Sequence, residues 1–233
     1  MNVALCLSGL TRSVSWTCPL INRYLIDPFD ADLFIHTWEE DHGGNRANSL
    51  YNDGLAPSIQ DGRTKKEFLK EEFHNLRALK LEKHQQWAND NNTFNSAKAM
   101  YYGIFESFNL TTLVNKKYDL VIRARMDSFF NTFIPENEID DALQNNVVYW
   151  SLPGRQWGEN YISDIFAFGN YSVMNHYANT WKEQLYHSDL PEELLTNQLK
   201  EKNIDTKWSE VKYKMTNEWG PNFVTVWSDE EDR

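Results

Sequence analysis

The sequence predicts an α/β fold with a mostly parallel central sheet flanked by helices. Apolar runs over 3–7, 32–38 and 118–127 have the length and composition of buried strands. Segments with apolar residues at helical spacing lie between these runs, and strands that alternate with helices favour parallel pairing. No repeat or low-complexity linker divides the 233 residues. We therefore expect one domain over 1–233, with 228–233 as a frayed tail.

The remaining elements follow from periodicity and from turn residues. A turn at 8–13 leads into a helix through residue 26, and 39–63 lacks periodicity and reads as a long loop. The segment 64–88 is predicted to be one charged helix, because Phe68, Leu69, Phe73, Leu76 and Leu79 have helical spacing. Further helices are expected from residue 95 or 96 and over 172–186 and 192–202. Further strands are expected over 147–152, 166–168, 209–215 and 223–227.

Composition excludes several classes of protein. The net charge is −11, which argues against general binding of nucleic acids, although a local basic pocket remains compatible with it. The two cysteines, Cys6 and Cys18, indicate neither a disulfide scaffold nor a zinc site, and Cys6 is expected to be a buried thiol. The first residues lack the basic region of a signal peptide, and no apolar run approaches the ~20 residues of a membrane span. We expect a cytoplasmic protein.

The run 118–127 carries the first candidate site. Alternation along a strand places Arg123, Arg125 and Asp127 on one face. Two cations beside one carboxylate suit a polyanion such as a nucleotide diphosphate, with Asp127 available to a divalent metal. The alternative is an Arg–Asp pair on a solvated strand face.

The turn after the first strand carries the second candidate. Ser8, Gly9, Thr11 and Arg12 join a strand end to a helix start, where backbone N–H groups can face an anion and Arg12 can add charge. The glycine spacing matches neither a P-loop nor a dinucleotide fingerprint. The alternative is a tight turn with a solvated arginine.

The segment 157–169 carries the third candidate. Asp164 precedes a short apolar strand and suits a general base that deprotonates an acceptor hydroxyl, while Trp157 and Tyr161 can stack on a sugar or a base. The alternative is that Asp164 caps a turn. His36 lies inside an apolar strand and is expected to be a hydrogen-bonded core histidine rather than a catalytic one.

In combination, 3–12, 32–38, 118–127 and 163–169 resemble small GT-A-type glycosyltransferases of bacterial surface-polysaccharide clusters and viruses. The resemblance implies a nucleotide-sugar donor bound by the N-terminal half. It places 123–127 where these enzymes carry an Asp-x-Asp metal motif for Mn²⁺ or Mg²⁺, and Asp164 in the acceptor region as the base. The first aspartate of that motif is Arg125 here. This departure leaves Asp127 as the single ligand, and Arg125 can replace part of the charge of the metal.

The expected function is transfer of a sugar from a nucleotide-diphosphate donor to a saccharide or lipid-linked acceptor, in the synthesis of surface polysaccharide. On this interpretation Ser8, Gly9, Thr11, Arg12, Arg123 and Arg125 bind the donor, Trp157 and Tyr161 the acceptor, and Asp127 the metal. Two alternatives stay open. One is a sugar-phosphate nucleotidyltransferase, and the other is a nucleotide- or carbohydrate-binding module without catalysis.

Overall fold

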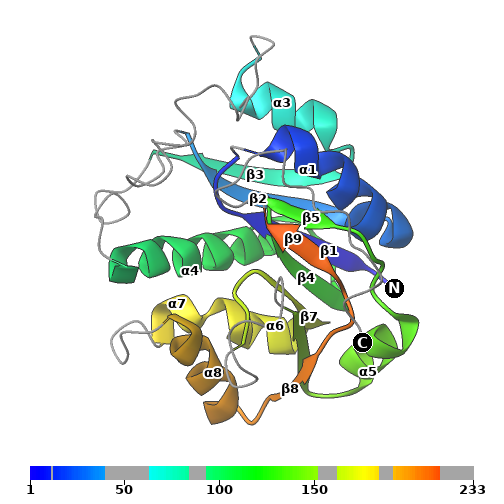
Figure 1. Ribbon diagram of the computed structural model, residues 1–233, viewed down its shortest axis with the longest axis vertical. Helices are drawn as coiled ribbons and strands as arrows, with labels where there is room; N and C mark the ends of the chain where they lie inside the picture. Colours follow the sequence, from blue (N-terminus) through cyan, green and yellow to red (C-terminus); the bar gives the residue numbers. More distant parts are fainter. Residues whose placement is uncertain (12, 40–62, 84–92, 152–161, 184–190, 216–233) are drawn as a thin grey trace, which may run out of the picture.

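A seven-stranded sheet forms the centre of the protein in a computed structural model that describes residues 1–11, 13–39, 63–83, 93–151, 162–183 and 191–215. The strand order is β3-β2-β1-β4-β7-β6-β8, and Figure 1 shows the strands in nearly this order from top to bottom. Their bounds are β1 Val3–Ser8, β2 Asp32–Trp38, β3 Leu76–Glu82, β4 Leu120–Arg125, β6 Val147–Ser151, β7 Phe166–Asn170 and β8 Asp205–Trp208.

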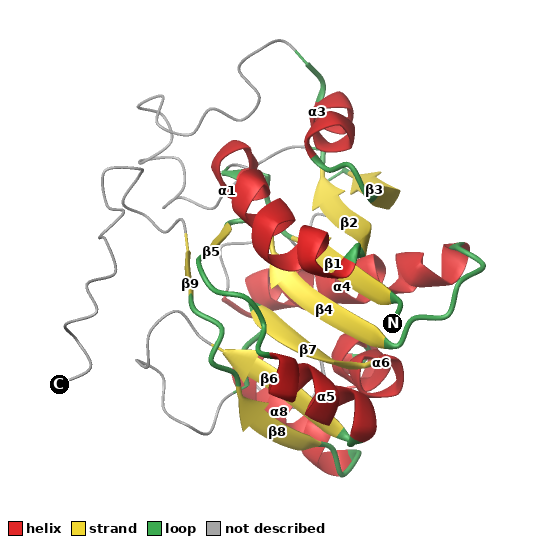
Figure 2. Cartoon of the chain, turned by 90° about the vertical axis from the view of Figure 1, so that its right-hand side faces the viewer, coloured by secondary structure: helices red, strands yellow, loops and turns green. Residues whose placement is uncertain are grey.

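Parallel pairing dominates this sheet. Within the strands that the structure describes, β7 alone runs against the others, because it pairs antiparallel with both β4 and β6. The chain leaves β1 for β2 on one side and returns to β4 on the other. The carboxyl ends of β1 and β4 therefore meet at a reversal of strand order, which is where open α/β sheets bind ligands. The arrowheads of β4, β6 and β8 point to one side of the molecule (Figure 2).

Helices cover both faces of the sheet and create two apolar cores. One core contains side chains of α1, α3 and α5, and the other contains side chains of α4, α6 and α8. Figure 2 shows α1 and α5 in front of the sheet, with α4, α6 and α8 behind it. The helix bounds are α1 Val14–Ile21, α3 Lys65–Glu72, α4 Thr93–Asn109, α5 Glu136–Gln144, α6 Tyr171–Ala178, α7 Thr180–Glu183 and α8 Pro191–Glu201. The predicted fold class is confirmed.

Short helical segments complete these layers. The chain continues from α1 through a π-helical turn, Asn22–Ile26, and a 3-10 turn, Asp27–Phe29, so the predicted helical end at residue 26 is close to the observed one. Another 3-10 turn, Leu110–Leu113, follows α4. Cys6 and Cys18 are both buried and free, as expected for Cys6. None of the described helices combines the length and apolar character that a membrane span requires.

A small second sheet lies beside the carboxyl ends of the main strands. It pairs β5, Ser128–Phe130, antiparallel with β9, Tyr213–Met215. Figures 1 and 2 place this pair on the side toward which the strands of the main sheet point. Phe130, Phe166 and Tyr213 pack together, with ring centroids 5.3 to 5.9 Å apart. The predicted late strand at 209–215 is thus present in part, whereas 223–227 and the tail 228–233 lie outside the described residues.

The prediction of one helix over 64–88 is wrong. A capping box at Thr64 and Glu67 starts α3, which ends at Glu72, and the chain then forms the edge strand β3. Leu76 pairs with Leu33, but Ala78 pairs with the next residue, Phe34, so Arg77 is an extra residue in a bulge. The bulge lets Leu76 and Leu79 pack into the same core although they are three residues apart. That spacing is the one that imitates a helix.

Other boundaries differ from the prediction for local reasons. The strand expected over 118–127 ends at Arg125, and a turn follows it. The helix expected over 172–186 breaks at Asn179, whose side-chain amide donates to the Asn175 carbonyl oxygen at 2.8 Å. None of the predicted elements corresponds to α5, β5 or β8. β8 is an exposed edge strand without the alternation of a half-buried one. Most of the predicted loop at 39–63 lies outside the described residues.

Candidate functional site

The site is built at the carboxyl ends of β1, β2 and β4. Ser8 is aligned with His36 of β2 on one side and with Arg125 of β4 on the other. The turn predicted to bind the donor therefore lies beside the predicted cation cluster. Ser8 and Thr11 are buried, and Arg12 lies outside the described residues.

Gly9 gives the turn its path. Its φ is +125°, a conformation that L side chains rarely adopt, while a Cβ at this position would meet nothing within 4 Å. Glycine is therefore required by the backbone conformation and not by crowding. Thr37 at the end of β2 donates from its hydroxyl to the Gly9 carbonyl oxygen at 2.7 Å. This bond fixes the turn against the neighbouring strand.

Arg125 and Asp127 form a two-pronged ion pair. The Nε and Nη2 atoms of Arg125 donate to the two carboxylate oxygens of Asp127, at 2.9 and 2.7 Å. The side chain of Asp127 is 5 % exposed and that of Arg125 is 30 % exposed. The two residues do not share a strand face as predicted, because β4 ends at Arg125 and the turn brings the carboxylate back to it. The pair is not the solvated surface pair of the alternative reading.

Arg123 is buried much more deeply than its role as a donor ligand predicts. The residue is 2 % exposed, its Nη1 donates to the Ala124 carbonyl oxygen, and its Nε has no partner among the described residues. Burial lowers the pKa of Arg123, while Tyr177 and Asp164 act in the opposite direction. An arginine nevertheless stays charged at neutral pH. Arg123 thus contributes a fixed positive charge beneath the site.

Asp164 lies with these arginines although it is far from them in the sequence. It is 9 % exposed, and its charge acts to raise the pKa of both Arg123 and Arg125. The turn in front of β7 is stabilised by Ser163, because the Ser163 hydroxyl accepts from the Ile165 amide at 3.0 Å. This turn bond therefore involves Ser163 and not Asp164. The candidate acceptor residues Trp157 and Tyr161 lie outside the described residues.

Two tyrosines belong to the same cluster, and neither was predicted to be a site residue. Tyr177 of α6 donates to the Ser163 carbonyl oxygen at 2.8 Å, and Tyr213 of β9 donates to the Ser151 carbonyl oxygen at 2.7 Å. Burial is the main cause that raises the pKa of each phenol, and Asp164 adds to it. A strand was predicted over 209–215, but nothing in that segment indicates that the strand lies beside this site.

The described residues do not fit the divalent metal that the resemblance implies. No group of three or more His, Cys, Asp or Glu side chains in the described part of the chain is arranged to hold an ion. Both oxygens of Asp127 already accept hydrogen bonds from Arg125. A metal at Asp127 would have to displace that guanidinium.

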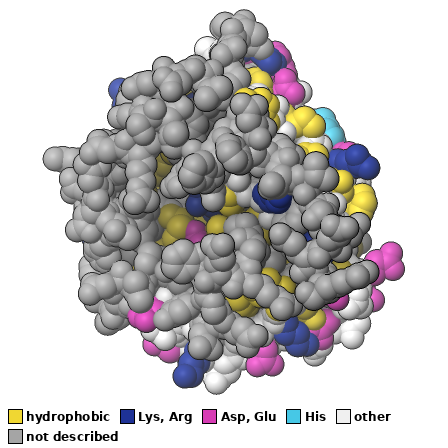
Figure 3. Space-filling view, in the orientation of Figure 1, with side chains coloured by type: hydrophobic (Ala, Val, Ile, Leu, Met, Phe, Trp, Pro, Cys, Tyr) yellow, Lys and Arg dark blue, Asp and Glu magenta, His cyan; other side chains and the backbone are white. Residues whose placement is uncertain are grey.

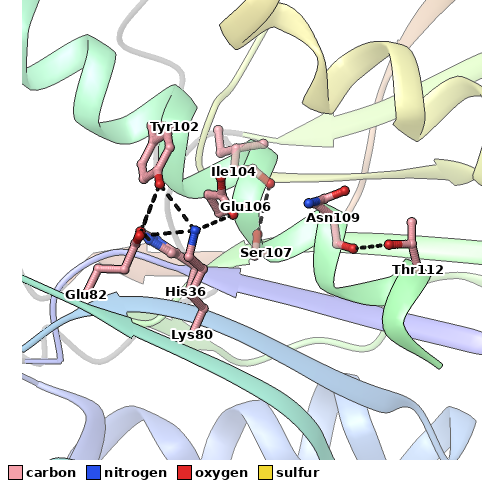
Figure 4. Close-up of polar contacts among 9 residues, drawn as sticks. All are labelled: His36, Lys80, Glu82, Tyr102, Ile104, Glu106, Ser107, Asn109 and Thr112. Carbon is pink, nitrogen blue, oxygen red and sulfur yellow. Dashed lines mark hydrogen bonds and ion pairs between the residues drawn. The ribbon is translucent and has the colours of Figure 1, made fainter.

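A second polar cluster lies beside the site, between the ends of β2 and β3 and the helix α4. His36 is fully buried, and its Nε2 lies 2.8 Å from Glu82 Oε2, which also accepts from the Tyr102 hydroxyl at 2.9 Å. Lys80 donates to Glu106 at 2.7 Å, and Figure 4 shows these side chains converging beneath α4. The prediction of a hydrogen-bonded core histidine is confirmed.

The electrostatics of this cluster keep His36 neutral. Burial lowers the pKa of His36 and outweighs the opposite effect of Glu82. Burial raises the pKa of Glu82, but the hydrogen bonds from His36, Lys80 and Tyr102 lower it overall. The cluster is therefore a neutral imidazole that donates to a carboxylate, with Lys80 as its cation. Its place beside Ser8 makes it a support for the turn.

The face at which the strands end combines charge with apolar surface. Figure 3 shows basic and acidic side chains beside hydrophobic ones near its centre. Comparison of the chain with protein-family models and with curated proteins finds no match.

Proposed function

We propose that this protein is a glycosyltransferase that moves a sugar from a nucleotide-diphosphate donor to a saccharide or lipid-linked acceptor. The observation that carries the proposal is the convergence of the Gly9 turn, the Arg125–Asp127 pair and Asp164 where β1 and β4 end. These segments are far apart in the sequence. They combine an anion-binding turn, a cation and a carboxylate, which are the groups that this transfer needs.

The chemistry assigns one task to each group. The acceptor hydroxyl attacks the anomeric carbon of the donor sugar as the bond from that carbon to the phosphate oxygen breaks. The bonding electrons leave with the nucleoside diphosphate, and the hydroxyl proton passes to the Asp164 carboxylate. Arg125 stabilises the charge that develops on the diphosphate, which is larger in the transition state than in the bound donor.

The buried charges prepare the site for this reaction. Arg123 lies beneath Asp164 and cannot reach bulk water, so its positive charge is little screened. Arg123 therefore contributes a fixed positive charge to the local field, while the more exposed Arg125 is the group that meets the donor.

The decisive experiment is the substitution Asp164→Asn. The amide cannot accept the proton, so transfer is expected to fall by about 10²–10⁴-fold while nucleoside-diphosphate binding persists. Asp119→Asn is a matched control at the opposite, amino-terminal end of β4, where the carboxylate accepts from the Asn2 amide. Unchanged turnover in Asp164→Asn would remove this residue from the mechanism.

The product separates this proposal from its alternatives. Glycosyl transfer releases a nucleoside diphosphate, whereas a sugar-phosphate nucleotidyltransferase releases pyrophosphate. Binding of donors without any product across a panel of acceptors would favour a binding module. A cytoplasmic location and a role in polysaccharide synthesis remain parts of the proposal.

A further inference from the structure

We propose that this protein binds the diphosphate of its donor without a divalent cation, and that the Arg125 guanidinium supplies the positive charge in its place. The inference rests on the proposed function, because it concerns the same donor. It departs from the metal dependence that the Asp-x-Asp resemblance implies. Three features of the site support it.

The first feature is the occupancy of the Asp127 carboxylate. Arg125 bonds both oxygens, at 2.9 and 2.7 Å, and the carboxylate is 5 % exposed. A divalent ion such as Mg²⁺ takes about six oxygen ligands and usually keeps several of its waters. Both oxygens of Asp127 already accept hydrogen bonds, and the side chain is nearly buried. Binding of a metal here would cost two charge-assisted hydrogen bonds.

The second feature is the balance of charge. The negative charges of Asp127 and Asp164 both raise the pKa of Arg125. Both carboxylates therefore already lie near a positive charge. Arg123 adds a second cation, fully buried, whose Nε has no partner among the described residues. A divalent ion at Asp127 would be repelled by the Arg125 guanidinium and by the charge of Arg123, in a site where charges are poorly screened. A phosphate group is attracted by the same charges.

The third feature is the difference in access between the two arginines. The Arg125 side chain is 30 % exposed, whereas Arg123 is 2 % exposed. A guanidinium presents the same planar fork to a carboxylate and to a phosphate. Asp127 therefore occupies the fork that a phosphate would use, and it is the group that the phosphate oxygens replace. As the diphosphate binds, the fork turns from the carboxylate to the phosphate oxygens.

The first test measures the binding of UDP, GDP and dTDP to the full chain, by thermal shift and calorimetry, in EDTA and in Mn²⁺. We expect at least one of them to bind with a Kd that agrees within about threefold between the two conditions. Binding that requires Mn²⁺ would overturn the inference and leave the proposed function in place. Failure of all three to bind in both conditions would refute the proposed function as well.

The second test uses variants, because the two readings of Asp127 predict opposite results. Arg125→Gln is expected to weaken binding by about tenfold or more, and Mn²⁺ should not restore it. If Asp127 were a metal ligand, loss of Arg125 would release its oxygens and Mn²⁺ would restore binding. Asp127→Asn should bind within about threefold of the natural protein in EDTA, whereas loss of a metal ligand would abolish binding.

Two further variants control for folding. Arg77→Gln removes an arginine that bonds a buried carboxylate at the opposite end of the sheet, and it should leave binding unchanged. Arg125→Lys keeps the charge and loses the fork, so it should bind less tightly than the natural protein and independently of Mn²⁺. Metal-dependent binding by Arg125→Lys would contradict the inference even if Arg125→Gln failed to fold.

Discussion

Two buried aspartates at opposite ends of the sheet differ in how they are held. Asp32 begins β2, its side chain is 3 % exposed, and three donors reach it: Arg77 at 2.5 Å, Lys116 at 2.6 Å and the Tyr118 hydroxyl at 2.9 Å. Asp127 follows β4, is 5 % exposed, and is held by the fork of Arg125. The two side chains are almost equally buried, so they differ in their hydrogen-bond partners and not in their exposure to water.

The two aspartates differ in how far along the chain their partners lie. The donors to Asp32 are 45, 84 and 86 residues away, so the cluster ties β2 to β3 and to the start of β4. The Arg125–Asp127 pair spans two residues and joins no distant elements. A carboxylate held from three directions cannot exchange its partners easily. The fork of Arg125 is a local partner of Asp127, and it can turn away without separating distant elements.

The largest expected effect comes from Asp32→Asn. Loss of the charge removes or weakens three charge-assisted hydrogen bonds, so the free energy of unfolding should fall by about 2–3 kcal/mol after allowance for the exposure of Arg77 and Lys116. Asp127→Asn should cost about 1 kcal/mol, because Arg125 can turn to water. Urea denaturation at pH 7 measures both values. Equal losses would break the comparison.

The pH dependence of stability tests the same cluster. Burial raises the pKa of Asp32, but Lys116, Arg77 and Tyr118 lower it below the ordinary value. The cluster therefore stabilises the fold above the unfolded-state pKa of about 3.9, and this contribution is lost as the pH falls through the lower folded-state value. Asp32→Asn should flatten the acid decline by up to about 1.4 kcal/mol per pH unit. If the free energy of unfolding fell equally at acid pH in the natural protein and in Asp32→Asn, this prediction would be contradicted.

A histidine near the carboxyl end of β2 gives a smaller effect. Burial lowers the pKa of His36, so the unfolded chain takes up a proton before the folded one does. Stability should thus fall as the pH drops below the unfolded-state pKa of about 6.5, by at most about 1.4 kcal/mol per pH unit, and His36→Gln should remove this slope. His74, whose side chain is 56 % exposed, supplies the control His74→Gln. A slope that survives in His36→Gln would show that another group causes it.

The smallest effect is expected from Arg77→Gln. Arg77 is 56 % exposed, and Lys116 and Tyr118 still hold Asp32 without it, so the loss of stability should be about 0.5 kcal/mol. Chemical denaturation measures it. A loss as large as that of Asp32→Asn would mean that Arg77 alone carries the cluster, and the contrast between several distant donors and a local arginine would disappear.

Much of the central sheet could be predicted from the sequence. The strands at 3–8, 32–38 and 120–125 are fully or almost fully buried, so continuous apolar runs mark them. β3 was missed because its bulge gives Leu76 and Leu79 the spacing of a helix, and β8 because an exposed edge strand carries no apolar pattern. Edge strands depend on a neighbouring strand more than on their own composition.

The candidate site could be predicted as a set of residue types but not as a geometry. Strand order brings Ser8 beside Arg125, which agrees with the expectation that carboxyl ends of parallel strands meet. No local pattern shows that Arg123 is buried or that Tyr177 and Tyr213 lie near Asp164. These facts depend on α6 and β9, which return to the site from distant parts of the chain.

The sequence by itself determined the alternation of buried strands and helices, because burial of apolar side chains is recorded locally at each position. The tertiary structure alone decided which polar groups face one another. It gave Asp32 three distant donors, and the turn after β4 brought Asp127 to the nearby Arg125. The reason is that a charge interacts with whatever lies within a few ångströms in space, and the chain determines those distances only by folding.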